Sequence, residues 1–180
     1  LLADAVTTFG SGIDQTVQKL EYGWNNRGLR ARATSWGKDG GGADIVRNEV
    51  TYQYNAFNQL WKEHQAHNGT VNSDANAQVV EYTYADGSAN TVRPASLINP
   101  SGSTVAYYYG SDLDDALSRP QALKEGTNTL ASMRYLGLGT VVGLKYDAAS
   151  NVEMMLDSGS SGDIYTGLDR FGRLAQTLWK

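Results

Sequence analysis

The feature that most constrains the fold of this chain is a recurring pattern, apolar-x-aromatic-x-aromatic, that is usually followed by turn residues. The four clear copies are Leu20-Glu21-Tyr22-Gly23-Trp24, Val50-Thr51-Tyr52-Gln53-Tyr54, Val80-Glu81-Tyr82-Thr83-Tyr84 and Val105-Ala106-Tyr107-Tyr108-Tyr109. A period of two places the apolar and aromatic members on one face of a β-strand and the residues between them on the other. Because Tyr22, Tyr52 and Tyr82 recur every 30 residues, we expect rows of tyrosines across neighbouring strands.

Turn chemistry accompanies several of these strands. Asn or Asp at the first position of a turn can bind the turn backbone, and Gly or Asn at the fourth position can adopt a left-handed conformation. The residues at these two positions are Asn25 with Gly28, Asn55 with Asn58, and Asp169 with Gly172. We therefore predict positive φ at all three fourth positions. Together the patterns predict hairpins near residues 16–36, 48–65, 78–109, 130–147 and 163–180.

The composition also indicates an all-β fold. Aromatic residues make up 10% of the chain, and the 11 tyrosines are suited to half-buried strands whose hydroxyls stay hydrated. A single hairpin is only marginally stable, so repeated hairpins must bury their faces against one another. We expect tandem β-hairpins in a continuous twisted or spiralling antiparallel sheet, with residues 1–180 forming one repeat region cut from a longer chain. One short helix is expected within residues 112–124, capped by Asp112 and ended by Pro120.

The strand-turn-strand unit resembles the RHS/YD repeat, whose core reads Tyr-x-Tyr-Asp-x-x-Gly-Arg-Leu. Residues that fit this core are Tyr52, Tyr54, Asn55 and Leu60, and then Asp169, Gly172, Arg173 and Leu174. Asn58 and Gln59 replace its Gly-Arg. Segments 85–91, 135–142 and 165–173 are similar to parts of very long family members, so the resemblance covers about residues 16–180.

The resemblance implies a sheet that in relatives forms a large hollow shell, secreted or at the cell surface. Some shells enclose a toxic domain, and some members mediate cell contact. The Asp-Pro-x-Gly segment of self-cleaving shells does not occur in this sequence. We therefore expect a non-enzymatic structural module of an extracellular protein: a shell, a stalk or a self-assembling fibre. Its partners would be flanking repeats or further copies of itself. The alternatives are a module that binds a glycan or a cell-surface partner protein, and part of a toxin-encapsulating shell.

Composition argues against several other classes of function. The net charge of −4 is unlike that of a nucleic-acid-binding protein, and the Arg27, Arg30 and Arg32 cluster is interpreted as a solvated face. The chain has no cysteine, which excludes disulfides, zinc-thiolate sites and cysteine nucleophiles. No apolar run reaches the roughly 20 residues of a membrane span.

Candidate metal and phosphate sites are each interpreted as structural. His64 and His67 would point to opposite faces of a strand, which does not suit a shared metal. The acids Asp112, Asp114 and Asp115 lack the remaining ligands of a calcium loop and are expected to be a helix cap with solvated carboxylates. The glycine run 40–42 is not followed by the Lys-Ser/Thr of a phosphate-binding loop.

Candidate modification and catalytic residues lie in predicted loops. Asn68-Gly69-Thr70 matches the N-glycosylation pattern. Carboxylates that could form a glycosidase pair are interpreted as surface acids: Asp147, Glu153, Asp157 and Asp163. No catalytic residue, cofactor or metal ligand is expected.

Overall fold

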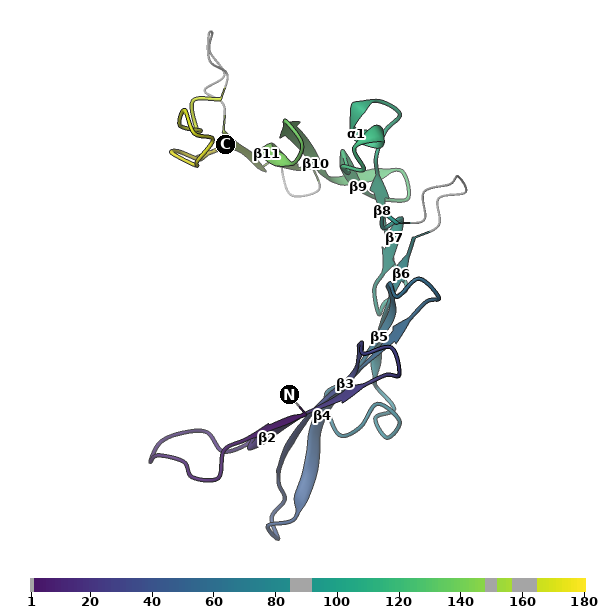
Figure 1. Ribbon diagram of the computed structural model, residues 1–180, viewed down its shortest axis with the longest axis vertical. Helices are drawn as coiled ribbons and strands as arrows, with labels where there is room; N and C mark the ends of the chain where they lie inside the picture. The colour runs from purple at the N-terminus through teal and green to yellow at the C-terminus, as the bar shows by residue number, and fades with distance from the viewer. Residues whose placement is uncertain (1, 85–91, 148–151, 157–164) are drawn as a thin grey trace. The chain divides into compact units, whose positions relative to one another are not determined.

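The structure is a computed structural model that describes residues 2–84, 92–147, 152–156 and 165–180 (Figure 1). Its thirteen strands form one antiparallel sheet that is not closed, and they follow one another in the sheet in sequence order. The expected all-β fold is thereby confirmed. Contacts divide the chain into two compact units, the first comprising Leu1–Thr83 with Ile98–Gly102 and the second comprising Tyr84–Leu97 with Ser103–Lys180.

The first unit holds six strands. They are β1 (Ala3–Ala5), β2 (Lys19–Trp24), β3 (Arg30–Lys38), β4 (Asp44–Tyr54), β5 (Leu60–Ala66) and β6 (Gln78–Thr83). Strand β4 is the longest and pairs with β3 on one side and β5 on the other. Tyr22 of β2 lies opposite Ala33, and Tyr52 of β4 lies opposite Glu63.

The hairpin turns share one hydrogen-bonding pattern. Asn25 Oδ1 accepts from the backbone amides of Arg27 and Leu29 at 2.9 and 3.0 Å. Asn55 and Asp169 accept in the same way from residues two and four positions later. The fourth residues have left-handed backbones: φ is 75° at Gly28, 65° at Asn58 and 75° at Gly172. The prediction of positive φ is thus confirmed at all three positions.

A fourth turn of this type was not predicted. Asp39 Oδ1 accepts from the amides of Gly41 and Ala43 at 2.9 Å each, and Gly42 has a φ of 85°. The glycine run 40–42 is therefore the tight turn that joins β3 to β4.

The remaining elements lie mostly in the second unit. They are β7 (Ser96–Ile98), β8 (Thr104–Tyr108), α1 (Leu113–Ala116), β9 (Ala122–Glu125), β10 (Asn128–Leu136), β11 (Thr140–Tyr146), β12 (Val152–Met155) and β13 (Leu178–Trp179). Strand β7 interrupts the expected 78–109 hairpin. The expected 163–180 hairpin is reduced to an isolated Leu168–Leu174 bridge and the two-residue β13.

The expected helix is present but shorter. Asp112 caps it as predicted, because its Oδ1 accepts from the Asp114 amide at 3.0 Å. Helix α1 ends at Ala116, before Pro120, and Ser118 then has a left-handed φ of 54°. The chain turns there so that residues from Ala122 onward can form β9.

The two units bury different kinds of side chain. In the second unit the described buried apolar side chains include Val142, which is 1% exposed, together with Ala122, Ala131, Met155 and Leu156. In the first unit the buried positions are mainly polar: Thr34, Ser35 and Glu49. Since a buried polar group needs partners, the surroundings of Glu49 identify the candidate site.

Candidate functional site

Glu49 is a buried carboxylate at the centre of the first unit. Its side chain lies in a row with Thr34 of β3 and Ala66 of β5, and it is 6% exposed. Oε2 accepts from the Thr34 hydroxyl at 3.0 Å, and Arg32 Nε lies 3.9 Å from the same oxygen. Oε1 accepts from the backbone amide of Val71 at 3.0 Å. The carboxylate therefore fastens the loop between β5 and β6 to the sheet.

That loop, residues 67–77, is held by its own hydrogen bonds. Asp74 Oδ2 accepts from the amides of His67 and Asn68 at 3.1 and 3.2 Å, and Oδ1 accepts from Asn76 at 2.9 Å. These hydrogen bonds lower the pKa of the Asp74 carboxyl, and the bond from the Asn76 amide has the largest effect. The Gly69 amide also donates to the Arg47 carbonyl at 3.2 Å. The loop is thus a folded cover over one face of the sheet.

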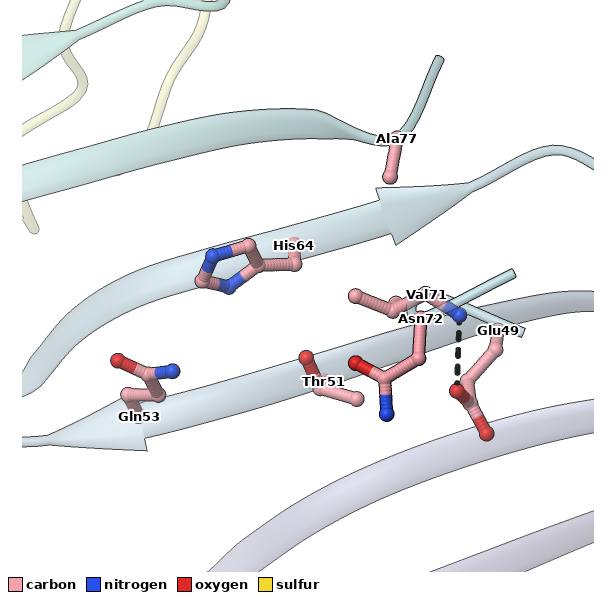
Figure 2. A pocket seen from close by; sticks show the side chains of 7 residues that line it. All are labelled: Glu49, Thr51, Gln53, His64, Val71, Asn72 and Ala77. Atoms are coloured by element: carbon pink, nitrogen blue, oxygen red, sulfur yellow. Dashed lines mark hydrogen bonds between the residues drawn. The ribbon is translucent and has the colours of Figure 1, made fainter. Parts of the chain in front are cut away.

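A pocket of about 320 Å³ lies between this cover and the sheet (Figure 2). It is lined by Glu49, Thr51, Gln53, His64, Val71, Asn72 and Ala77. Thr51 and Gln53 follow Glu49 on the same face of β4, and His64 lies opposite Thr51 on β5. Gln53 and Asn72 are exposed at the rim, whereas Glu49 is buried. His64 Nδ1 is buried without a hydrogen-bond partner.

The pocket shows that the face of β4 opposite its tyrosines is partly covered. In the first unit the pocket lies on the face opposite Tyr52 and Tyr54, where Thr51 is half-buried and Gln53 remains exposed. The 67–77 cover buries part of this polar face, because its Val71 amide binds Glu49.

A second arrangement of side chains, an Arg-Pro pair in contact with a later tyrosine, occurs twice in the second unit. The Tyr109 hydroxyl donates to the Pro94 carbonyl at 2.8 Å, and Arg93 lies over the Tyr109 ring at 4.2 Å. The Tyr135 hydroxyl donates to the Pro120 carbonyl at 2.8 Å, and Arg119 lies over that ring at 4.9 Å. We call each set a clasp. Burial raises the pKa of both tyrosines.

Helix α1 connects the two clasps. Its Asp115 pairs with Arg93 at 2.7 Å, and its Asp114 pairs with Arg119, which also donates to the Gly137 carbonyl. Asp114, whose side chain is 19% exposed, is therefore not the solvated acid that was expected, whereas Asp115 pairs with Arg93 and keeps 41% of its side chain exposed. They are structural ion-pair partners that hold β8, α1 and the following strands together.

Most other predicted repeat residues take part in contacts within the sheet. The Arg30 guanidinium lies 5.0 Å from the Tyr22 ring and 5.6 Å from the Trp24 ring, and its carbonyl accepts from the Tyr54 hydroxyl at 2.8 Å. Arg27 donates to the Asn55 carbonyl at 3.1 Å, joining two neighbouring turns. The basic cluster is exposed, as expected, but its side chains bind the sheet.

The predicted aromatic residues are not equally buried. Tyr22, Tyr52, Tyr54, Tyr82, Tyr84 and Tyr107 are half-buried, and Tyr109 is buried. Trp24 is 45% exposed. Desolvation by burial raises the pKa of Tyr52 and of Tyr84. In the last turn, Arg173 pairs with Asp169 at 2.7 Å.

The other candidate residues are scattered. His67 is exposed and does not line the pocket, and Asn68 is exposed in the 67–77 cover. Asp147 pairs with Lys145 at 2.7 Å, and Glu153 with Arg134 at 3.3 Å. Asp157, Asp163 and segment 85–91 lie outside the described residues. In the part of the chain that the structure describes, no three His, Asp or Glu side chains cluster as metal ligands would. No helix among those residues is long and apolar enough to cross a membrane.

Comparison with known proteins adds no assignment. No protein-family model matches the chain, and no curated protein matches it.

Neither the pocket nor the clasps were predicted from the sequence, for different reasons. The clasps leave a detectable signal, because Arg93-Pro94 with Tyr109 recurs 26 residues later as Arg119-Pro120 with Tyr135. The pocket leaves no such signal. Glu49 reads as an ordinary outward residue, and its burial depends on a loop of low apolar content.

Proposed function

We propose that this chain is a structural repeat module, of the RHS/YD type, in a large extracellular or cell-surface assembly and that it carries out no catalysis. The observation that carries the proposal is the open sheet, in which each strand among the described residues lies next to the strands that precede and follow it in the chain. Such an array has no central core and gains stability by adding units.

The edges of the sheet support assembly with further strands. The strand order ends on β1 and on β13. The Leu2 carbonyl accepts from the Tyr22 amide at 2.7 Å, and the Val6 amide donates to the Gln18 carbonyl at 2.9 Å. Because alternate residues of an antiparallel strand bond to opposite sides, the amides of Ala3 and Ala5 point to the open edge. Unpaired edge groups of this kind are templates for another strand.

Exposed apolar side chains near β1 also support assembly. Leu2, Val6 and Ile13 are 71%, 53% and 59% exposed, and Leu20 on β2 is 41% exposed. Covering them would add apolar burial to the backbone bonds of the edge. Flanking repeats would extend the sheet into a shell, whereas further copies that add head to tail would form a filament.

The test is light scattering and electron microscopy of the chain at increasing concentration. We expect species larger than a monomer. Ala5→Pro removes the outward amide donor and should reduce the assembled fraction, while the control Ala5→Val keeps the donor and should not. A monodisperse monomer at high concentration, with the amides of β1 and β13 protected from hydrogen exchange, would overturn the proposal.

A further inference from the structure

We infer that the pocket beneath the 67–77 cover binds one neutral sugar residue. The inference concerns only residues of the first unit and does not depend on assembly.

The pocket presents polar side chains that are not used elsewhere. Among the described residues, the side chains of Thr51, Gln53 and Asn72 have no hydrogen-bond partner in the protein, and His64 Nδ1 is buried and unpaired. Because the buried Nδ1 has almost no accessible surface, the polar groups that a ligand can reach from the pocket are those of Thr51, Gln53 and Asn72. In Figure 2 the amide of Asn72 and the hydroxyl of Thr51 border the same space.

The available groups both donate and accept. Each carboxamide of Gln53 and Asn72 offers a carbonyl acceptor next to an NH₂ donor, and Thr51 adds a hydroxyl. Adjacent hydroxyls on a sugar ring also donate and accept, so one carboxamide can bind two of them. Val71 and Ala77 supply small apolar surfaces for the C–H groups of the ring.

Charge and size favour a neutral ligand of one ring. Glu49 lies in the lining, so an anion such as phosphate or a uronic acid would be repelled. A cation would find only this carboxylate, whose oxygens already accept from Thr34 and Val71. The volume of about 320 Å³ is at the small end of ligand pockets.

The experiment is a chemical-shift titration of the isotope-labelled full chain. The probes are methyl α-D-glucopyranoside, methyl α-D-galactopyranoside, methyl α-D-mannopyranoside and N-acetyl-D-glucosamine. We expect at least one to shift the Val71 amide, the His64 ring and the side-chain amides of Gln53 and Asn72, with inorganic phosphate shifting none of them.

A pair of glutamine variants tests the site. Gln53→Leu should weaken binding about tenfold, the loss expected when one hydrogen-bonding side chain is removed. Gln65→Leu is the matched control, because Gln65 is exposed on β5 next to His64 but on the opposite face, and it should leave binding unchanged. The inference is overturned if no probe shifts these resonances, or if both variants weaken binding equally.

Discussion

At the scale of single residues, the turns depend on one left-handed backbone position. Gly42, at φ 85°, and Gly40, which has no left-handed backbone, belong to the same turn, and a Cβ added to either would meet no atom within 4 Å. Both positions therefore have room for a side chain, and they differ only in backbone conformation. Gly42→Val should destabilise the protein by about 1–2 kcal/mol more than Gly40→Val. Urea unfolding of the two variants measures this difference, and equal stability would contradict the turn mechanism.

The half-buried tyrosines predict a loss of stability at alkaline pH. Burial raises the pKa of Tyr52, Tyr84, Tyr109 and Tyr135, so the folded state holds the phenol proton more tightly than the unfolded state. Their contribution is complete below the unfolded value of about 10 and declines as the pH rises through the folded pKa. Thermal unfolding followed at a series of pH values, alongside tyrosinate absorbance, tests this prediction. A melting temperature that stays constant while the tyrosines ionise would disprove it.

Lys145 also contributes to the loss of stability at alkaline pH, and its contribution can be separated from that of the tyrosines. Asp147 raises the pKa of Lys145, so this pair also weakens at high pH. Asp147→Asn removes that contribution, and we expect most of the alkaline loss to remain in this variant.

At the scale of elements, the clasps join each Arg-Pro segment to a later tyrosine, which lies directly after β8 in one clasp and on β10 in the other. Tyr109→Phe removes the hydroxyl that binds the Pro94 carbonyl and should cost about 1 kcal/mol. Tyr108→Phe alters the neighbouring tyrosine, which is 46% exposed and lies under the Lys124 ammonium, and should cost much less. Denaturant melts compare the two. A larger effect of Tyr108→Phe would show that the clasp does not stabilise the second unit.

At the scale of the whole molecule, each described strand pairs only with the strands next to it in the chain, which predicts local effects of mutation. Val142 on β11 is 1% exposed, so Val142→Ala removes buried methyl groups and should destabilise by about 1–3 kcal/mol. In a nearest-neighbour array this loss should raise amide exchange in β10–β12 and leave β3–β5 nearly unchanged. Hydrogen exchange read strand by strand tests this. Uniform acceleration across both units would indicate one cooperative fold instead.

Much of the fold could be predicted because its determinants are local. The period-two pattern around Tyr52 and the Asn55 turn each act within a few residues, and both strands and left-handed turns form where they were expected. The capping of α1 by Asp112 is local in the same sense. After Gly172 the turn forms but the expected strand is mostly absent, although Arg173 and Leu174 fit the repeat core.

The sequence by itself determined the fold class, the turn positions and the helix cap, because each depends on backbone preferences and on side chains that bind nearby amides. Only the tertiary structure decided which face of β4 is covered and which polar groups are buried. The buried Glu49 accepts from the amide of Val71, 22 residues later, and His64, which lines the same pocket, has a buried Nδ1 without a partner. Contacts over such separations depend on how a loop folds back on the sheet, and no periodicity in the chain encodes that path.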